Sequence, residues 1–203
     1  MSTIKFNKHD TASFDVDAQN GFTPLCPDQL PVPGGDEIAA PLNAQALLVR
    51  LRFGSKDAHS QNAEFVGKAW PRHCEVGTFG FELIEGLPKP DEYDYFVYKG
   101  VERSLHPYGA CYHNEDWDVR KVTTGAIEVL KFNGIKNVIV GGLATDYCVK
   151  NTALQLKDAG FEVILNLAAC RGISEETVST AIGEMRKAGV IVVDDVVTSG
   201  LFN

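Results

Sequence analysis

Residues 137–151, with the sequence NVIVGGLATDYCVKN, constrain the fold of this chain more than any other stretch. The β-branched apolar run at residues 138–140 is typical of a strand that is buried on both faces. The two glycines that follow allow a tight turn, and Thr145 and Asp146 are residue types that often begin helices. The pattern therefore predicts a buried strand, a turn and a helix in succession.

Cys148 falls in the first turn of that predicted helix. The unpaired N–H groups and the positive end of the helix dipole favour a thiolate at such a position. Open α/β sheets also tend to place their chemistry at a junction of this kind. A free cysteine is equally one of the residue types most often buried in a core. Position alone leaves Cys148 as either a nucleophile or a small core side chain.

Composition narrows the class of protein. The 203 residues are 44% hydrophobic, which is enough for one domain spanning residues 1–203. A formal net charge of -8 argues against nucleic acid and anionic membranes as partners, and no apolar run has the roughly 18 to 20 residues of a membrane span. The first ten residues, MSTIKFNKHD, lack the apolar core of a secretory signal. Five widely spaced cysteines suit a reducing compartment, so we expect a cytoplasmic protein.

Strand and helix patterns alternate along the chain, which predicts an α/β fold: three α/β/α layers with a mostly parallel sheet. Cys170 is expected in a strand-to-helix loop, with a structural role. We expect strands at residues 11–16, 52–56, 93–98, 138–140, 161–165 and 190–193, and helices at residues 36–51, 119–132 and 174–187 in addition to the one that carries Cys148.

Chemically useful side chains follow four of these strands. They are Asp17, Asp57, Lys99 and Cys148. Taken singly, Asp17 could equally cap a turn, and Lys99 could be a surface lysine with a buried stem. The carboxyl ends of parallel strands lie along one edge of a sheet, however, so the four side chains are expected to converge there. That convergence favours a functional site.

Asp57 and His59 lie two residues apart at the exit of a strand, so they point to the same side and can chelate one ion. His73, in the segment WPRHC, is a third candidate ligand. Two histidines and one aspartate suit a divalent transition metal that keeps positions open for water or substrate, although spacing alone leaves surface placement as the alternative. The long segment 101–116 is expected to be a binding loop, and we interpret its His106 and His113 as polar loop residues.

Five motifs in this order carry a family resemblance: DVDAQNGF, DAH, WPRHC, YFVYKG and GGLATDYCVKN. The chain resembles the nicotinamidase/pyrazinamidase branch of the isochorismatase-like cysteine hydrolases from about residue 15 to residue 193. The resemblance implies the fold of that family and a metal-assisted hydrolysis of nicotinamide to nicotinate and ammonia, through a thioester, in NAD salvage. Another amidase or an isochorismatase-type hydrolase of the same superfamily is the alternative.

Matched motif by motif, the resemblance implies a catalytic triad of Asp17, Lys99 and Cys148. It implies a metal held by Asp57, His59 and His73, with zinc expected first and iron or manganese as alternatives. The N–H groups of Ala144 and Cys148 would form the oxyanion hole, after a cis peptide between Leu143 and Ala144. The substrate would contact Phe22, Trp70, Tyr108 and Leu143.

Two departures from the family pattern stand out. Some relatives have a further histidine eight residues after the aspartate of DxH, where this chain has Phe65. Glu64 beside it is a candidate fourth ligand; a surface position, with water completing the coordination, is the alternative. Segment 101–116 does not follow the branch closely, which leaves the exact substrate open. The expected partner is a small-molecule amide, and a homo-oligomer is an open alternative to a monomer.

Overall fold

The computed structural model describes residues 5–202, so the predictions made on the first four residues and on residue 203 lie outside the described part. The sheet has six strands in the order β3-β2-β1-β4-β5-β6, and every neighbouring pair is parallel. The strands are β1 (Thr11–Val16), β2 (Leu51–Asp57), β3 (Tyr95–Lys99), β4 (Asn137–Leu143), β5 (Glu162–Arg171) and β6 (Ile191–Val193), and the α-helices are α1 (Ala39–Ala46), α2 (Ala126–Phe132), α3 (Lys150–Asp158) and α4 (Glu175–Lys187).

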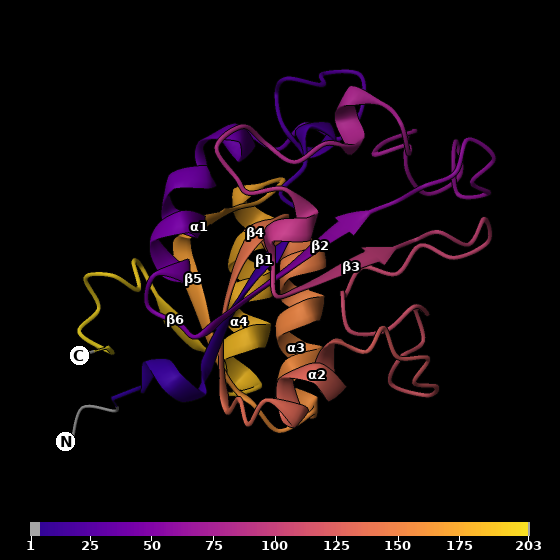
Figure 1. Cartoon of the computed structure of the whole chain (residues 1–203). Coiled ribbons are helices and arrows are strands. Elements are labelled where there is room, and N and C mark those ends of the chain that lie inside the picture. Colours follow the sequence, from indigo (N-terminus) through magenta and orange to yellow (C-terminus); the bar gives the residue numbers. More distant parts are fainter. Residues whose placement is uncertain (1–4, 203) are drawn as a thin grey trace.

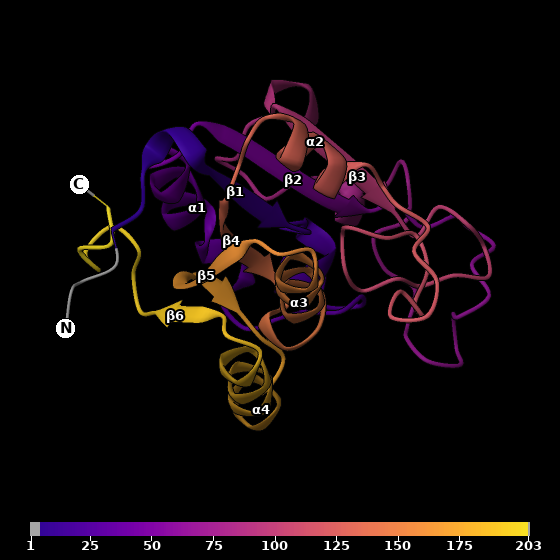
Figure 2. The same ribbon diagram turned by 90° about the horizontal axis from the view of Figure 1, so that it is seen from below.

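Helices cover both faces of the sheet, as the alternating pattern predicts (Figures 1 and 2). On one face, side chains of α2, α3 and α4 join Phe14, Phe53 and Val140 in the largest apolar cluster. On the other face, Leu42 of α1 packs in a second cluster, and Ile139 and Ile164 form a third. Burial on both faces explains why β4 and β5 contain the continuous apolar runs at residues 138–140 and 163–165.

Two predicted helices are shorter than expected. The predicted helix 36–51 is α1, which ends at Ala46, and the chain is already in β2 at Leu51. The predicted helix 119–132 begins only at Ala126, because Gly125 precedes it in a left-handed conformation with φ of 87°. Cys170 was also placed wrongly: it lies within β5, which runs to Arg171, and its side chain is buried.

The strand order changes direction between β1 and β4, which are neighbours at the centre of the sheet. Their carboxyl ends approach closely: a Cβ on Gly142 would lie 2.0 Å from the carbonyl oxygen of Val16, so only glycine fits there. In doubly wound sheets such a switch point is where ligands bind.

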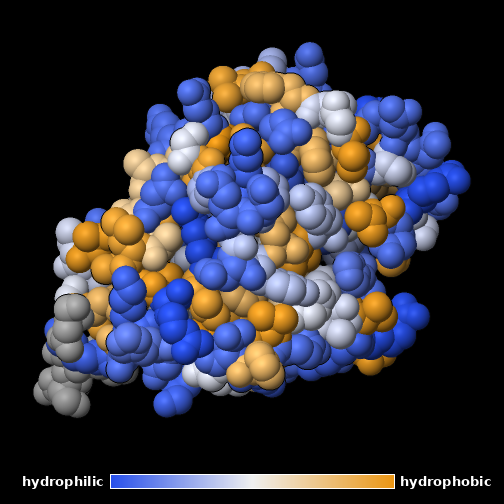
Figure 3. Space-filling view, in the orientation of Figure 1, coloured by the Kyte–Doolittle hydropathy of each residue, from blue (hydrophilic) through white to orange (hydrophobic). Residues whose placement is uncertain are grey.

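Two long connections leave the carboxyl ends of β2 and β3, and their first stretches lie side by side in both ribbon views (Figures 1 and 2). They comprise residues 58–94 and 100–125, and the Glu64 N–H donates to the Arg103 carbonyl at 2.8 Å. Elsewhere, the face seen in Figure 3 is largely hydrophilic, with separate hydrophobic areas. Among residues 5–202, no helix has the length and apolar character needed to cross a membrane.

Candidate active site

Asp17, Asp57, Lys99 and Cys148 meet at the carboxyl edge of the sheet, as the sequence predicts. Asp17 directly follows β1, while Asp57 and Lys99 are the last residues of β2 and β3 and lie in register with each other. All four side chains are buried, at 5% exposure or less. Four groups from separate strands therefore share one enclosed site.

Lys99 is the centre of this group. Its Nζ lies 2.9 Å from Asp17 Oδ2 and 2.6 Å from Asp57 Oδ1. It also donates to the Pro107 carbonyl at 3.0 Å and lies 3.7 Å from Cys148 Sγ. The two carboxylates raise the pKa of Lys99 well above its usual value although burial opposes its charge, so the group is a fixed cation.

Asp17 is held in one orientation by its neighbour on β2. The Ser55 hydroxyl donates to Asp17 Oδ1 at 2.7 Å, and the Asp17 N–H donates to the Ser55 carbonyl at 3.2 Å. Asp17 has a left-handed backbone conformation, with φ of 44°. Burial raises the pKa of Asp17, and Lys99 offsets only part of that rise. A carboxylate with a raised pKa is suited to accepting a proton.

Cys148 differs from the expectation in one respect. The helix dipole was expected to favour a thiolate, but burial, together with Asp17 and Asp57, raises the pKa of the Cys148 thiol well above its usual value despite the nearby Lys99. The sulfur is therefore a thiol in the free protein. Its proton has a base close by, since Asp17, Asp57 and Cys148 each offer an atom within 4.8 Å of the others.

A π-helical turn, Thr145–Val149, carries Cys148 between β4 and α3. The Val149 N–H donates to the Ala144 carbonyl at 3.1 Å, five residues back, and the Tyr147 N–H donates to the same oxygen at 3.1 Å. The preceding Leu143–Ala144 peptide is cis, as the resemblance implied. Inserted turns of this type are frequent at functional sites.

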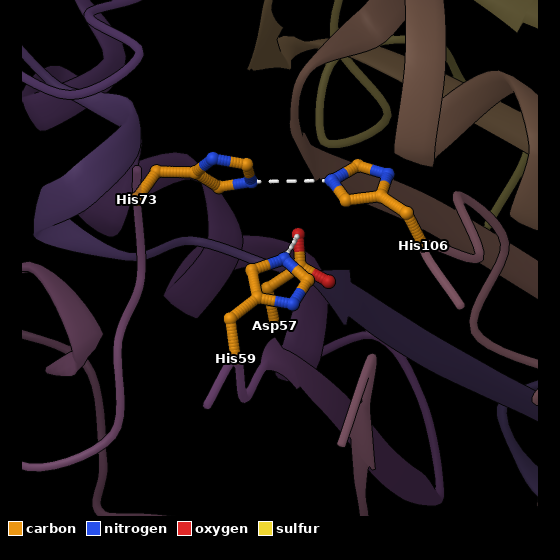
Figure 4. A group of neighbouring side chains, drawn as sticks. All are labelled: Asp57, His59, His73 and His106. Carbon is orange, nitrogen blue, oxygen red and sulfur yellow. Dashed lines mark hydrogen bonds and ion pairs between the residues drawn. The ribbon is translucent and has the colours of Figure 1, made fainter. Parts of the chain in front are cut away.

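A second cluster adjoins the first through Asp57 and consists of Asp57, His59, His73 and His106. One potential ligand atom from each lies within 4.8 Å of the others, and Figure 4 shows the four side chains pointing toward one another. His59 Nδ1 lies 3.1 Å from the Gly100 carbonyl, and His73 Nδ1 lies 2.7 Å from the Pro71 carbonyl. These bonds place the ring protons on Nδ1, so each Nε2 presents a lone pair.

The cluster fits a divalent metal ion. Asp57 Oδ2 and His59 Nε2 are buried, lie 3.6 Å apart and have no hydrogen-bond partner among the described residues. His73 Nε2 and His106 Nε2 lie 3.3 Å apart, within hydrogen-bond distance, so both ring nitrogens face the centre of the cluster. Burial is the main cause that lowers the pKa of His73 to about 4 and that of His106 to about 3, so both rings are neutral ligands at pH 7. Three imidazoles and a carboxylate suit zinc and similar ions.

His106 corrects the sequence analysis, which treated it as a polar loop residue. It is 9% exposed and its ring is 5.0 Å from that of His59, because the long loops 58–94 and 100–125 pack together. His113, from the same loop, is not in the cluster. Glu64 is exposed and does not join the cluster either, so the structure does not support it as a ligand. Sequence spacing could not find His106, because 47 residues separate it from His59.

A narrow cavity of about 30 Å³, measured as the space open to the centre of a water molecule, lies beside Cys148. Phe22, Trp70 and Tyr108 line it, as predicted. Leu143 does not; its side chain is fully buried in the cluster that contains Phe22. Tyr147, beside the candidate nucleophile in sequence, is a wall that the sequence analysis missed. The other lining residues are Leu30, Val32, Asp57, His73, His106, Ala144, Cys148 and Ile173.

The sequence of residues 11–195 matches the family model of the Isochorismatase domain. The chain belongs to the isochorismatase family.

Three relatives span most of this isochorismatase-family chain. The nicotinamidase of Acinetobacter baylyi is 31% identical over 195 residues, which cover 86% of this chain and 88% of the relative. The crystal structure of PnC1 from L. infantum in complex with nicotinate matches with a TM-score of 0.85 at 25% identity, covering 98% of each chain. The pyrazinamidase of Pyrococcus horikoshii in complex with zinc matches with a TM-score of 0.78 at 32% identity, covering 91% of this chain and 98% of that one.

Phe65, one of the two departures from the family pattern, packs against the histidines of this isochorismatase-family chain. The Phe65 ring lies 4.6 Å from that of His59, 5.3 Å from that of His73 and 4.5 Å from that of His106. Phe65 therefore forms an apolar side of the cluster, and the fourth candidate ligand, His106, comes from the other long loop.

Proposed function

We propose that the protein hydrolyses the carboxamide of nicotinamide to nicotinate and ammonia, with Cys148 as nucleophile. One observation carries this proposal: a buried lysine contacts the carboxylate of Asp17 and the sulfur of Cys148, and Cys148 lines a cavity with aromatic walls. The nicotinamidase relatives and the nicotinate complex of a similar structure support the choice of substrate.

The chemical character of the cavity lining suits a flat aromatic ring that carries an amide. Phe22, Trp70, Tyr108 and Tyr147 provide aromatic surface, and the Trp70 indole N–H donates to the Tyr108 hydroxyl at 3.1 Å, which fixes two walls together. The polar lining groups gather around Asp57, since His73, His106 and Cys148 each place an atom within 4.8 Å of it. Few polar groups in a mostly apolar pocket orient a small ligand.

Asp57, His59, His73 and His106 would hold one divalent metal ion, with zinc the first choice because a similar pyrazinamidase structure contains it. When bound, the ion would supply a Lewis acid that can anchor a ring nitrogen of the substrate. Asp57 would hold the ion and contact Lys99 at the same time. Burial opposes its charge, but Lys99 and His59 keep the pKa of Asp57 well below the usual range, so it is a carboxylate at pH 7.

In the first half of the reaction, Asp17 accepts the thiol proton as Cys148 Sγ attacks the amide carbon. Lys99 keeps its charge throughout and stabilises the carboxylate of Asp17 before the transfer and the sulfur during it. Because the pKa of the thiol is raised in the free protein, proton transfer accompanies attack rather than preceding substrate binding.

In the second half, Asp17 returns the proton to the amide nitrogen, the C–N bond breaks and ammonia leaves a thioester on Cys148. Water then attacks the thioester carbon, giving one proton to Asp17, and the C–S bond breaks. That proton passes to the departing sulfur, so the thiol is restored and the carboxylic acid is released. The oxygen that gains charge in both halves would be met by the N–H groups of Ala144 and Cys148, since both residues line the cavity.

Ammonia release from nicotinamide, measured with and without a chelator, tests the proposal. We expect turnover with the metal-loaded protein and its loss after chelation. Pyrazinamide, other amides and isochorismate are assayed in parallel. Turnover of one of these without turnover of nicotinamide would replace the proposed substrate with another of the same superfamily.

A further inference from the structure

Asp146 lies two residues before Cys148 in the π-helical turn but does not line the cavity. It is 4% exposed, and none of the ion pairs among residues 5–202 includes it. Both of its oxygens accept from the Ile173 N–H at 3.2 Å, and Oδ2 also accepts from the Thr177 hydroxyl. The proposed mechanism does not use this buried acid.

The partners of Asp146 belong to the connection between β5 and α4. Ser174 caps α4, its hydroxyl accepting from the Thr177 N–H at 3.2 Å, so Asp146 lies against the N-terminus of a 13-residue helix, where negative charge is stabilised. Gly172 allows this approach. A Cβ there would lie 3.0 Å from Asp146 Oδ1 and 2.1 Å from Val178.

Ile173 is the link to the site, because its side chain lines the same cavity as Cys148. Its backbone N–H is held by Asp146, two residues from the nucleophile. One carboxylate therefore fixes the distance between the turn that carries the sulfur and a wall that faces the substrate. Buried hydrogen bonds to a charged group are strong and directional, which suits them to this task.

We propose that Asp146 is a positioning residue that sets the Ile173 wall of the substrate cavity relative to Cys148. This rests on the proposed function for its substrate. Loss of the carboxylate frees residues 172–174 from the π-helical turn, which widens the cavity and weakens substrate binding more than it slows the chemical step.

The test compares D146A, I173A and the double variant by kcat and KM for nicotinamide. We expect D146A to raise KM at least tenfold while kcat falls less than threefold. I173A should raise KM similarly, and adding D146A to I173A should change KM less than threefold further, because both changes remove the same wall. A KM within twofold of wild type in D146A, or effects that multiply in the double variant, would overturn the proposal.

S174A is the matched control, because it removes the α4 cap but leaves the contact between Asp146 and Ile173. It should lower Tm by about 2–4 °C and leave KM within twofold of wild type. If D146A does not fold, D146N decides the question. Both carboxylate oxygens accept from the Ile173 N–H, so in D146N an NH2 donor replaces one of them and faces that N–H, and the negative charge is lost. KM should therefore rise at least threefold, and an unchanged KM would refute the role.

A measurement without substrate separates this inference from the proposed function. The rate of Cys148 alkylation by iodoacetamide should rise at least threefold in D146A and stay within twofold of wild type in S174A. If wild-type protein does not hydrolyse nicotinamide but the alkylation rates differ as expected, the substrate is wrong and the positioning role stands. Equal alkylation rates in D146A and wild type would contradict the role whatever the substrate.

Discussion

The two halves of the sheet supply the site in different ways. On the β4–β6 side, strands and helices alternate with short connections, and Cys148 and Ala144 lie in a hydrogen-bonded turn between β4 and α3. On the β1–β3 side, the long loops 58–94 and 100–125 contain no α-helix, yet they supply His59, His73 and His106. The candidate nucleophile thus lies on the β4–β6 side, the regular half. Most candidate groups for a metal and a substrate lie on loops of the β1–β3 side, the loop half, and loops can vary without disturbing the core.

Replacing the nucleophile should have the largest effect. We expect C148A to reduce kcat for ammonia release by about 10⁴-fold or more, because no other thiol lines the cavity in the described part of the chain. C111A is the control, since Cys111 is equally buried but lies outside the cavity. Wild-type turnover in C148A would show that the nucleophile does not come from the regular half of the sheet.

The role of the loop half in metal binding can be tested by replacing His106. H106A should weaken zinc binding by more than about 100-fold, the upper end of the loss seen for residues one shell further out. Elemental analysis after dialysis measures the bound metal. H113A, from the same loop, and E64Q should retain it, because neither side chain joins the cluster. One zinc per chain in H106A would show that this loop does not hold the ion.

Stability should depend on the regular half. L156A removes a fully buried side chain of α3 from the largest apolar cluster and should lower the free energy of unfolding by about 3 kcal/mol. V119S, in the loop half, should change it by less than about 0.5 kcal/mol because Val119 is 78% exposed. Urea denaturation measures both variants, and equal effects would contradict the contrast.

The histidine cluster predicts a pH-dependent loss of stability in metal-free protein. Burial lowers the pKa of His73 to about 4 and that of His106 to about 3, whereas the unfolded chain has the ordinary value near 6.5. Between these values the unfolded chain binds more protons, so stability falls as pH drops below about 6.5. At pH 5 the loss is about 2 kcal/mol for each histidine. Urea denaturation at pH 7 and pH 5 should show it, and the H73Q/H106Q variant should not.

Sequence patterns predicted the regular half best. The apolar run before Cys148 and the Ser174 cap mark β4 and the start of α4, because local periodicity and capping decide those elements. The four strand-end residues could be predicted to meet because parallel strands share one edge. A cytoplasmic location and a homo-oligomer remain predictions from sequence.

The loop half could not be predicted in the same way. His106 reaches His59 and His73 through packing between two long loops, which leaves no spacing signal in the sequence. The raised pKa of Cys148 was missed for a related reason. The helix terminus is visible in the sequence, but the burial and the two carboxylates that outweigh it come from β1 and β2.

The Lys99 ammonium group has more acceptors around it than hydrogens to donate. An ammonium group has three hydrogens to donate, yet Asp17, Asp57, the Pro107 carbonyl and the Cys148 sulfur all surround this one nitrogen. The sulfur, at 3.7 Å, is the most distant of the four acceptors, so it is the one left without a hydrogen bond from Lys99 when the other three are bonded. If Asp17 accepts a proton, or Asp57 binds a cation, that carboxylate accepts less strongly from Lys99. One ammonium hydrogen can then donate to the Cys148 sulfur as the sulfur becomes an anion.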